Sequence, residues 1–337
     1  MTTAQPIQYL GAIITAAVLS YVIIWAILPL LLRHALARPN ARSSHRVPTP
    51  QGAGIAVITA TVAVSLALCA RSHLADTTTL AILFGATLFM AFVGLADDIR
   101  SIPVLPRLLL QALAVAAIVL TTPDSLRIVS NCPLWIERAL LLLVLIWFVN
   151  LVNFMDGLDL MTAAEVVPVT AALVLLGGMG SIPASVTLVA AALCGAMVGF
   201  APFNRPTAKV FLGDVGSLPI GLLVGWCLLQ LAYHQHLVAA LLLPLYYLSD
   251  TTITLLRRIV RREAFWKAHR SHIYQRATDN GFTVSEVVSR VFMVNTGLGI
   301  LAVASTMSPA LSIRLLLLAG GCVAVAGLLY GFVRPRQ

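Results

Sequence analysis

The chain has 337 residues, of which 59% are hydrophobic and only 10% are charged. A soluble domain carries about 25% charged residues, so this composition indicates a protein that folds in lipid. The formal net charge is +9, but no basic stripe with interleaved aromatic side chains accompanies it, so nucleic acid is not expected as a partner. The five cysteines form no CxxC pair, which argues against a zinc site and a disulfide framework.

Long apolar runs follow one another along almost the whole chain. A bilayer core of about 30 Å needs roughly 20 apolar residues per helix, and this length predicts an all-α integral membrane protein of about 10–11 transmembrane helices. No polar segment is long enough to bury a core of its own, so we expect a single polytopic membrane domain over residues 1–337. The predicted spans lie near 8–32, 52–70, 79–96, 106–121, 138–152, 162–178, 184–201, 217–232, 237–256, 287–306 and 312–332.

The basic residues are divided unequally between the two sides of these spans. If the N-terminus lies outside, 18 of the 22 lysines and arginines fall on the inner side. Cytoplasmic loops of membrane proteins collect Lys and Arg, so the N-terminus is predicted to be outside and the C-terminus to be cytoplasmic.

Five polar segments on the predicted cytoplasmic side are rich in Asp, Asn, His and Gly, whereas the outer loops are short and nondescript. This convergence is the main functional signal, and it predicts an active site at the cytoplasmic face. The segments lie near 33–51, 97–107, 150–161, 203–217 and 257–286.

The first two segments combine backbone constraint with negative charge. Pro48 and Pro50 flank Thr49 and exclude a helix there, and the small residues that follow permit close backbone approach. Asp97 and Asp98 stand together at a predicted helix end, where two carboxylates repel each other unless a cation or proton lies between them. They are either solvated surface charge or the site of a magnesium-linked or general-base function.

The third segment places Asn150, Asn153, Asp156 and Asp159 three residues apart, so that each neighbours the next across a helical turn. Oxygen ligands of this kind suit Mg²⁺, and Asn and Asp also read nucleobase edges by hydrogen bonds. A structural helix cap would need one such residue rather than four.

The last two segments suit phosphate. The run Gly213–Ser217 precedes a predicted span, so its backbone N–H groups and the helix N-terminus are candidates to receive phosphate oxygens, with Asp214 holding a metal. In the final segment, Arg270 stands among His269 and His272, an arrangement that suits a doubly phosphorylated substrate. The alternative for this segment is a basic stretch that meets anionic lipid.

Taken in order, these motifs resemble those of the polyprenyl-phosphate N-acetylhexosamine-1-phosphate transferases, the superfamily of WecA- and MraY-type enzymes. The matching residues are Pro48-Thr49-Pro50-Gln51-Gly52, Asp97-Asp98, Asn150-x-x-Asn153-x-x-Asp156-Gly157-x-Asp159, Gly213-Asp214-x-Gly216-Ser217 and Arg270-Ser271-His272. The resemblance implies an enzyme of the bacterial cytoplasmic (inner) membrane that transfers a sugar-1-phosphate from a UDP-N-acetyl amino sugar to undecaprenyl phosphate and releases UMP. It also implies Mg²⁺ as cofactor, with Mn²⁺ able to substitute, and a homodimer is a further expectation.

The resemblance carries expected roles for particular residues. Catalytic roles fall on Asp97, Asp98, Asp156 and His272, and metal contacts on Asn153 and Asp214. Substrate binding falls on Arg46, Thr49, Arg107, Asn150, Asp159, Lys209, His269 and Arg270.

The chain also departs from the family pattern. Leu160 follows Asp159 where the family often has glycine, and Ala53 replaces one glycine of the first motif. Tyr274-Gln275 stands where WecA-like enzymes have two histidines. This version is similar to the WbpL-like branch, which initiates O-antigen chains on 6-deoxy amino sugars. The rival class is a polytopic secondary transporter, which would bind its substrate near the bilayer midplane between repeated halves.

Overall fold

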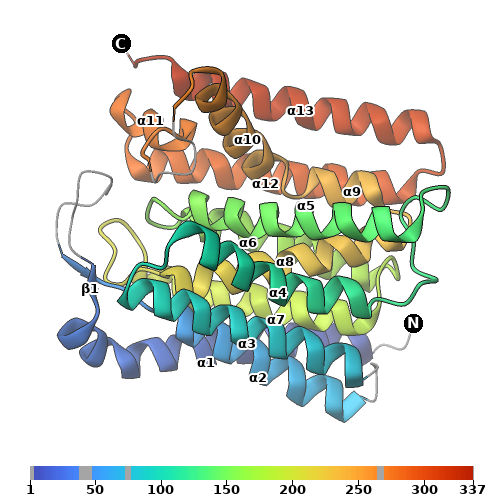
Figure 1. The fold of residues 1–337 in the computed structure, drawn as a ribbon, viewed down its shortest axis with the longest axis horizontal. Coiled ribbons are helices and arrows are strands. Elements are labelled where there is room, and N and C mark those ends of the chain that lie inside the picture. Colours follow the sequence, from blue (N-terminus) through green and yellow to red (C-terminus); the bar gives the residue numbers. More distant parts are fainter. Residues whose placement is uncertain (1–3, 38–47, 73–76, 264–268, 337) are drawn as a thin grey trace.

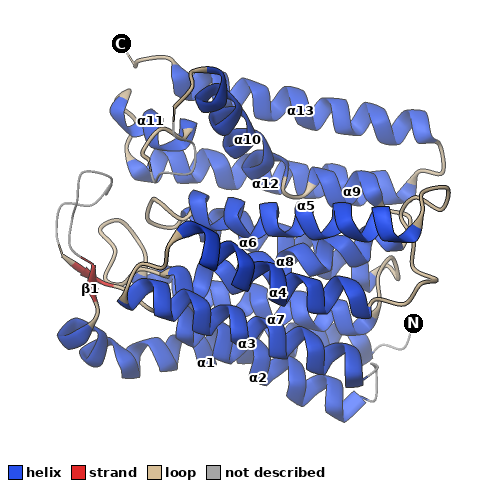
Figure 2. Ribbon diagram, in the orientation of Figure 1, coloured by secondary structure: helices blue, strands red, loops and turns tan. Residues whose placement is uncertain are grey.

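The computed structural model describes residues 4–37, 48–72, 77–263 and 269–336. In these ranges the chain is a bundle of helices that run mostly along one direction, with a two-stranded sheet at one end (Figures 1 and 2). Ten of the described helices are long and apolar enough to cross a membrane. The prediction of an all-α integral membrane protein is therefore confirmed.

The long helices are α1 (Ala4–His34), α2 (Gly54–Ser72), α3 (Thr77–Ile99), α4 (Val104–Thr121), α5 (Leu134–Met155), α6 (Met161–Gly178), α7 (Ala184–Phe200), α8 (Asp214–Tyr233), α12 (Val284–Met307) and α13 (Leu311–Val333). The shorter elements are β1 (Leu36–Ala37), β2 (Thr49–Pro50), the 3₁₀ helix η1 (Ala201–Phe203), α9 (Leu237–Leu242), α10 (Leu245–Val260) and α11 (Ile273–Asp279).

The predicted span at 237–256 is not one helix, and this prediction is wrong. The chain forms α9 and then α10, with Pro244 between them. Proline has no N–H group and its ring clashes with the preceding turn, so a helix breaks there. α10 is amphipathic: it buries Tyr247 and Asp250 on one side and exposes Ile253 and Val260 on another.

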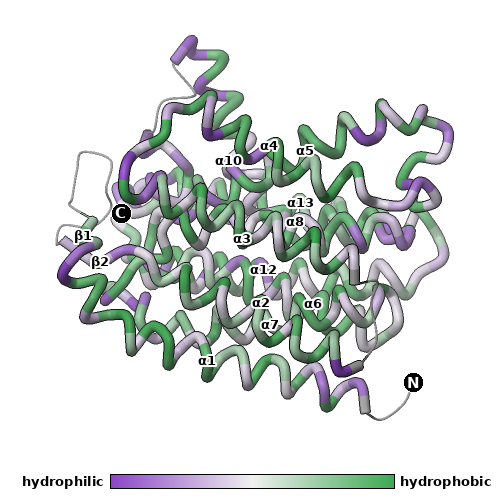
Figure 3. Tube along the Cα trace, turned by 60° about the horizontal axis from the view of Figure 1, so that its bottom comes forward, coloured by the Kyte–Doolittle hydropathy of each residue, from purple (hydrophilic) through white to green (hydrophobic). Residues whose placement is uncertain are grey.

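The core of the bundle lies around α8, in which every residue from Val215 to Tyr233 is buried. Helices α3, α5 and α7 pack against it, and the outer helices expose large apolar side chains such as Trp25, Leu113 and Leu316. Figure 3 shows hydrophobic residues along the helices and hydrophilic residues gathered in the loops and at helix ends. This pattern fits a bundle whose outer surface faces lipid tails.

The two termini lie at opposite ends of the bundle (Figure 1). The end that carries the C-terminus also carries the sheet, α11 and the loops that follow α3, α5 and α7 (Figure 1). We call it the polar end. The predicted polar segments, so far as the structure describes them, therefore meet at one end of the molecule, as the sequence predicts.

Candidate functional site

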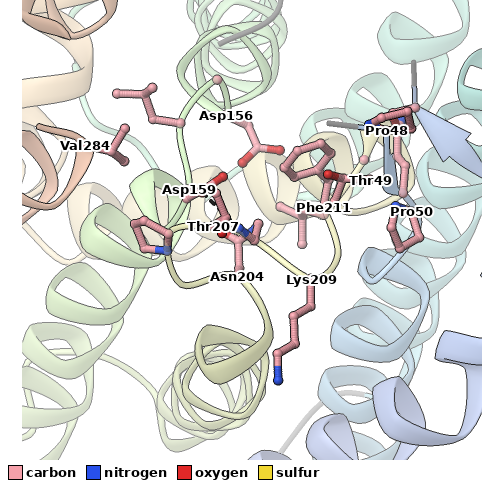
Figure 4. Close-up of a pocket in the computed structure, with 18 of the residues that line it drawn as sticks. Pro48, Thr49, Pro50, Asp156, Asp159, Asn204, Thr207, Lys209, Phe211 and Val284 are labelled. Carbon is pink, nitrogen blue, oxygen red and sulfur yellow. Dashed lines mark hydrogen bonds between the residues drawn. The ribbon is translucent and has the colours of Figure 1, made fainter. Parts of the chain in front are cut away.

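A cavity of about 930 Å³ opens at the polar end. Its walls come from the end of α1, from β2, from the loops after α5 and after η1, and from α11 (Figure 4). The predicted site residues that line it are Thr49, Asp156, Asp159, Lys209 and Asp214. Three of the five polar segments thus supply predicted residues to one cavity.

One wall is a backbone contact between the first and fourth segments. The N–H of Phe211 donates to the carbonyl of Pro50 at 2.8 Å, and the carbonyl of Phe211 accepts from the N–H of Gly52 at 3.1 Å. Next to this contact, a Cβ added to Gly54 would lie 2.3 Å from the Cα of Gly216. Since no other residue fits so close to a neighbouring backbone, the predicted close approach is confirmed.

Asp98 fixes the start of α8. Its two carboxylate oxygens accept hydrogen bonds from the backbone N–H groups of Asp214 at 2.9 Å and Val215 at 3.0 Å, and the side chain of Gln51 donates to it as well. The next two N–H groups of the helix donate to the carbonyl of Gly213. These four donors all have partners in this structure, and Asp98 occupies the position at the helix N-terminus where phosphate oxygens are expected. The phosphate contact of this helix N-terminus stays a prediction.

In a second cluster, the guanidinium group of Arg107 lies near a carboxylate of α3 and a carboxylate of α8. Arg107 Nη1 lies 2.9 Å from a carboxylate oxygen of Asp97 and 3.8 Å from one of Asp214. On the other side of Asp214, the side-chain amide of Asn153 donates to its carboxylate at 2.8 Å and to the hydroxyl of Ser217 at 2.9 Å. One guanidinium therefore serves two carboxylates, and Asp214 is the member that reaches the cavity.

The donor set around Asp214 fits a hard divalent cation. Mg²⁺ binds through one or two carboxylates together with substrate phosphates and waters, rather than in a complete protein cage. In keeping with that mode, the described residues contain no group of three or more His, Cys, Asp or Glu side chains arranged to hold a metal by themselves. Asp214 and Asn153 are hydrogen-bonded to each other, and their role as metal contacts stays a prediction.

Asp156 and Asp159 lie in the loop between α5 and α6 and line the cavity (Figure 4). Burial raises the pKa of Asp156 to about 6, with smaller contributions from the negative charges of Asp98 and Asp159, while a hydrogen bond from the hydroxyl of Thr162 opposes the shift. The carboxylate of Asp159 accepts a hydrogen bond from the N–H of Ala208 at 3.1 Å. These contacts tie the loop before α6 to the loop before α8.

Asn204 strengthens the same connection, and sequence reasoning gave it no role. Its side chain accepts a hydrogen bond from the N–H of Leu160 at 2.7 Å and donates to the carbonyl of Val210 at 2.9 Å. The chain at Leu160 has φ of 64°, in the left-handed region. Lys209 lies in the same loop, and its side chain extends away from the two aspartates (Figure 4).

Asn150 and Arg107 are predicted to bind substrate, and neither lines the cavity. Asn150 is buried, and its amide donates to the side-chain oxygen of Gln111 at 2.6 Å, so it joins α5 to α4. Its contact with substrate stays a prediction. Arg46 lies outside the described residues.

The predicted residues of the last segment also lie away from the cavity lining. His272 is 2% exposed, and its Nδ1 is 3.5 Å from the carboxylate of Asp250. Arg270 pairs with Asp279 at 2.8 Å, and His269 stacks on His272 with ring centroids 4.9 Å apart. Burial, followed by the nearby His272, lowers the pKa of His269 to about 4. None of these three residues lines the cavity. The catalytic role of His272 and the substrate contacts of His269 and Arg270 stay predictions.

The last polar segment also contains α11, a helix whose first residues are held by hydrogen bonds to other parts of the chain. The carboxylate of Asp250 accepts hydrogen bonds from the N–H groups of Ile273 and Tyr274, both at 2.9 Å. The hydroxyl of Tyr274 donates to the carbonyl of Phe154 at 3.0 Å, and a Cβ on Gly157 would lie 2.2 Å from that hydroxyl. Sequence reasoning assigned Asp250 no role, although a carboxylate within an apolar run is a signal that could have marked it.

A protein-family model matches part of this chain. Residues 80–232 match the model of the family described as Glycosyl transferase family 4. That match covers the second, third and fourth polar segments. It supports the superfamily that the motifs indicate.

Three individual proteins show the extent of the similarity. The "Probable undecaprenyl-phosphate N-acetylglucosaminyl 1-phosphate transferase" of Bacillus subtilis (strain 168) is 26% identical over 300 residues, 84% of this chain and 82% of its own length. The "Decaprenyl-phosphate N-acetylglucosaminephosphotransferase" of Mycolicibacterium smegmatis is 28% identical over 331 residues, 86% of this chain and 80% of its own. The "Phospho-N-acetylmuramoyl-pentapeptide-transferase" of Mycobacterium leprae is 32% identical over 173 residues, 45% of this chain and 47% of its own.

Proposed function

We propose that this protein transfers an N-acetylhexosamine-1-phosphate from a UDP-sugar to a polyprenyl phosphate and releases UMP. The observation that carries the proposal is the cavity at the polar end, where Asp156, Asp159 and Asp214 meet within a membrane-spanning bundle. A lipid acceptor requires an enzyme in the bilayer, and a nucleotide sugar requires a water-filled cavity at its edge. The names of the similar proteins point to the same reaction.

The proposed step is a phosphoryl transfer. An oxygen of the polyprenyl phosphate attacks the phosphorus that bears the sugar, and a new P–O–P bond forms. The bond from that phosphorus to the bridging oxygen of the UDP breaks, and UMP leaves with the electron pair. A phosphate monoester is largely ionised near pH 7, so the attack needs neutralisation of charge more than it needs a strong base.

Mg²⁺, or Mn²⁺ in its place, is part of this proposal. When bound, the cation would neutralise phosphate oxygens and the charge that develops on the leaving group. Asp214 and Asn153 would hold it, because they are in contact and Asp214 faces the cavity. Arg107 balances the charge of Asp97 and lies near Asp214.

The chain's residues then have distinct roles. Asp159 contacts the uridine, and Asp156 lines the same part of the cavity. Asp97 acts by holding Arg107, and Asp98 acts by fixing the start of α8. These two are positioning residues in this proposal, which revises the catalytic roles predicted from the motif.

The finer proposal concerns the donor and the pathway. We propose that the donor is a 6-deoxy N-acetyl amino sugar and that the product begins an O-antigen or related envelope glycan, with the site on the cytoplasmic face of the inner membrane. The departure at Tyr274-Gln275 from the WecA-like pattern supports it. An apolar pocket rejects an added hydroxyl only about 10²-fold, so UDP-N-acetylglucosamine should remain a measurable substrate.

The test is release of UMP by the purified protein in detergent, with undecaprenyl phosphate and a panel of UDP-sugars. We expect UMP and a lipid-linked sugar in equal amounts, dependent on both substrates. If no UDP-sugar yields UMP while the protein carries radiolabelled solute into sealed vesicles, the transferase proposal is wrong and a transporter is favoured.

A further inference from the structure

Within the described part of the last polar segment, Gln275 of α11 and Val284 line the cavity, and Gln275 is the polar one of the two. It is only 6% exposed, and its side-chain oxygen Oε1 has no hydrogen-bond partner among the described residues. A buried carboxamide oxygen without a partner is unfavourable. Such an atom at a cavity wall indicates that its partner comes from the ligand.

The structure fixes the backbone that carries this amide. The preceding residue, Tyr274, is anchored at its N–H by Asp250 and at its hydroxyl by Phe154. The amide nitrogen Nε2 of Gln275 packs close to Gly157, where an added Cβ would lie 2.9 Å from it. Because the adjacent backbone is held before a ligand arrives, less ordering is needed on binding, which favours selective recognition.

We propose that Oε1 of Gln275 accepts a hydrogen bond from an N–H or O–H group of the nucleotide sugar, so that Gln275 is a specificity-determining residue of the cavity. The inference rests on the proposed function. The donor group is either the imide N–H of uracil or a hydroxyl or acetamido N–H of the sugar. A neutral acceptor suits a cavity that already holds the carboxylates of Asp156, Asp159 and Asp214.

The test replaces the amide with a side chain of similar length that does not accept strong hydrogen bonds. Gln275→Met is compared with Gln230→Met, a matched control in α8 whose residue is 8% exposed and lines a separate cavity. Affinities for UMP, UDP and UDP-N-acetylglucosamine are measured by calorimetry in detergent, without acceptor. Thermal unfolding of each variant is recorded, and Gln275→Asn, whose shorter amide does not reach as far, serves if the Met variant is unstable.

We expect Gln275→Met to bind UDP-N-acetylglucosamine about 3- to 10-fold more weakly, with no change in Gln230→Met. A loss that extends equally to UMP assigns the contact to uracil, and a loss confined to the sugar nucleotide assigns it to the sugar. Wild-type affinity for all three ligands in Gln275→Met, or an equal loss in Gln230→Met, overturns this inference alone. A wild-type protein that neither binds UDP nor releases UMP overturns the proposed function together with it.

Discussion

Asp98 and Asp214 are 116 positions apart in the chain, yet the carboxylate of Asp98 accepts a 2.9 Å hydrogen bond from the backbone N–H of Asp214. The neighbouring N–H of Val215 donates to the other oxygen at 3.0 Å. The last turn of α3 thus determines where α8 begins. It also determines where the side chain of Asp214 enters the cavity.

Asp98→Asn should therefore weaken the protein without removing any group from the cavity lining. An amide keeps one acceptor oxygen and puts an NH₂ against a backbone N–H, so we expect a loss of about 1–3 kcal/mol of stability and reduced UMP release. Thermal unfolding in detergent measures the first effect. Asp124→Asn, an exposed carboxylate near the opposite end, is the control and should leave both values unchanged. Equal unfolding temperatures for Asp98→Asn and the wild type would contradict the anchoring role.

Asp214→Asn tests the proposal that Asp214 holds a divalent cation. If Asp214 holds Mg²⁺ against the pyrophosphate, loss of this one charge should lower turnover by about 10²- to 10³-fold. EDTA should silence the wild type, and Mg²⁺ or Mn²⁺ should restore it. Full turnover in EDTA would end the metal proposal, whatever the variant does.

Asp156 should make stability depend on pH. Its pKa is about 6 in the folded chain against an ordinary 3.8, so the folded state holds the proton more tightly than the unfolded state does. Stability should then fall as the pH rises from about 4 to 6 and stay lower above that window. Asp156→Asn removes this pH dependence because the amide does not titrate. The unfolding temperature of the variant minus that of the wild type should therefore be larger at pH 7.5 than at pH 4.5. Both proteins are measured without nucleotide or divalent cation. A difference that is constant across pH would refute the shifted pKa.

Leu160 tests the left-handed backbone before α6. Its φ of 64° costs about 1–2 kcal/mol for a residue with a Cβ, and glycine adopts it freely. We expect Leu160→Gly to stay near the wild type, since relief of this strain offsets the loss of partial side-chain burial. Leu160→Val, with a branched Cβ, should be less stable by about 1–3 kcal/mol. If the valine variant unfolds at the wild-type temperature, the left-handed conformation is incorrect.

The orientation in the membrane has a direct chemical test. Cys132 is partly exposed in the loop before α5, while Cys69, Cys194 and Cys227 are buried. A membrane-impermeant maleimide should label Cys132 in intact spheroplasts. In a Cys132→Ser background, a cysteine placed by Asp279→Cys at the polar end should react only after the membrane is opened. Labelling of that cysteine in sealed cells would place the cavity on the outer face.

The sequence predicts well those features that depend on the length of apolar runs and on the order of the spans along the chain. Apolar runs of about 20 residues define the long helices, and the polar segments meet because successive spans return the chain to the same end. The third segment shows the limit of a spacing argument. Residues three apart neighbour one another only on a continuous helix, and α5 ends at Met155. Asn150 therefore faces α4, while Asp156 and Asp159 stand in the loop beyond.

The last segment shows a second limit. The histidines and Arg270 have the residue types expected of a phosphate site, but burial and pairing depend on distant partners such as Asp250 and Asp279. The helix break at Pro244 was visible in the sequence as a proline, but the hydropathy of the run around it outweighed that signal.

The complete burial of α8 has a consequence for the position of Asp214. The helix that begins with Asp214 has no lipid-facing surface, since every residue after Asp214 is enclosed by neighbouring helices. A thicker or thinner bilayer acts first on the outer helices, which tilt to match it. Such a change reaches Asp214 only through the protein shell around α8. The helix that carries Asp214 is thus mechanically sheltered from the membrane in which the protein sits.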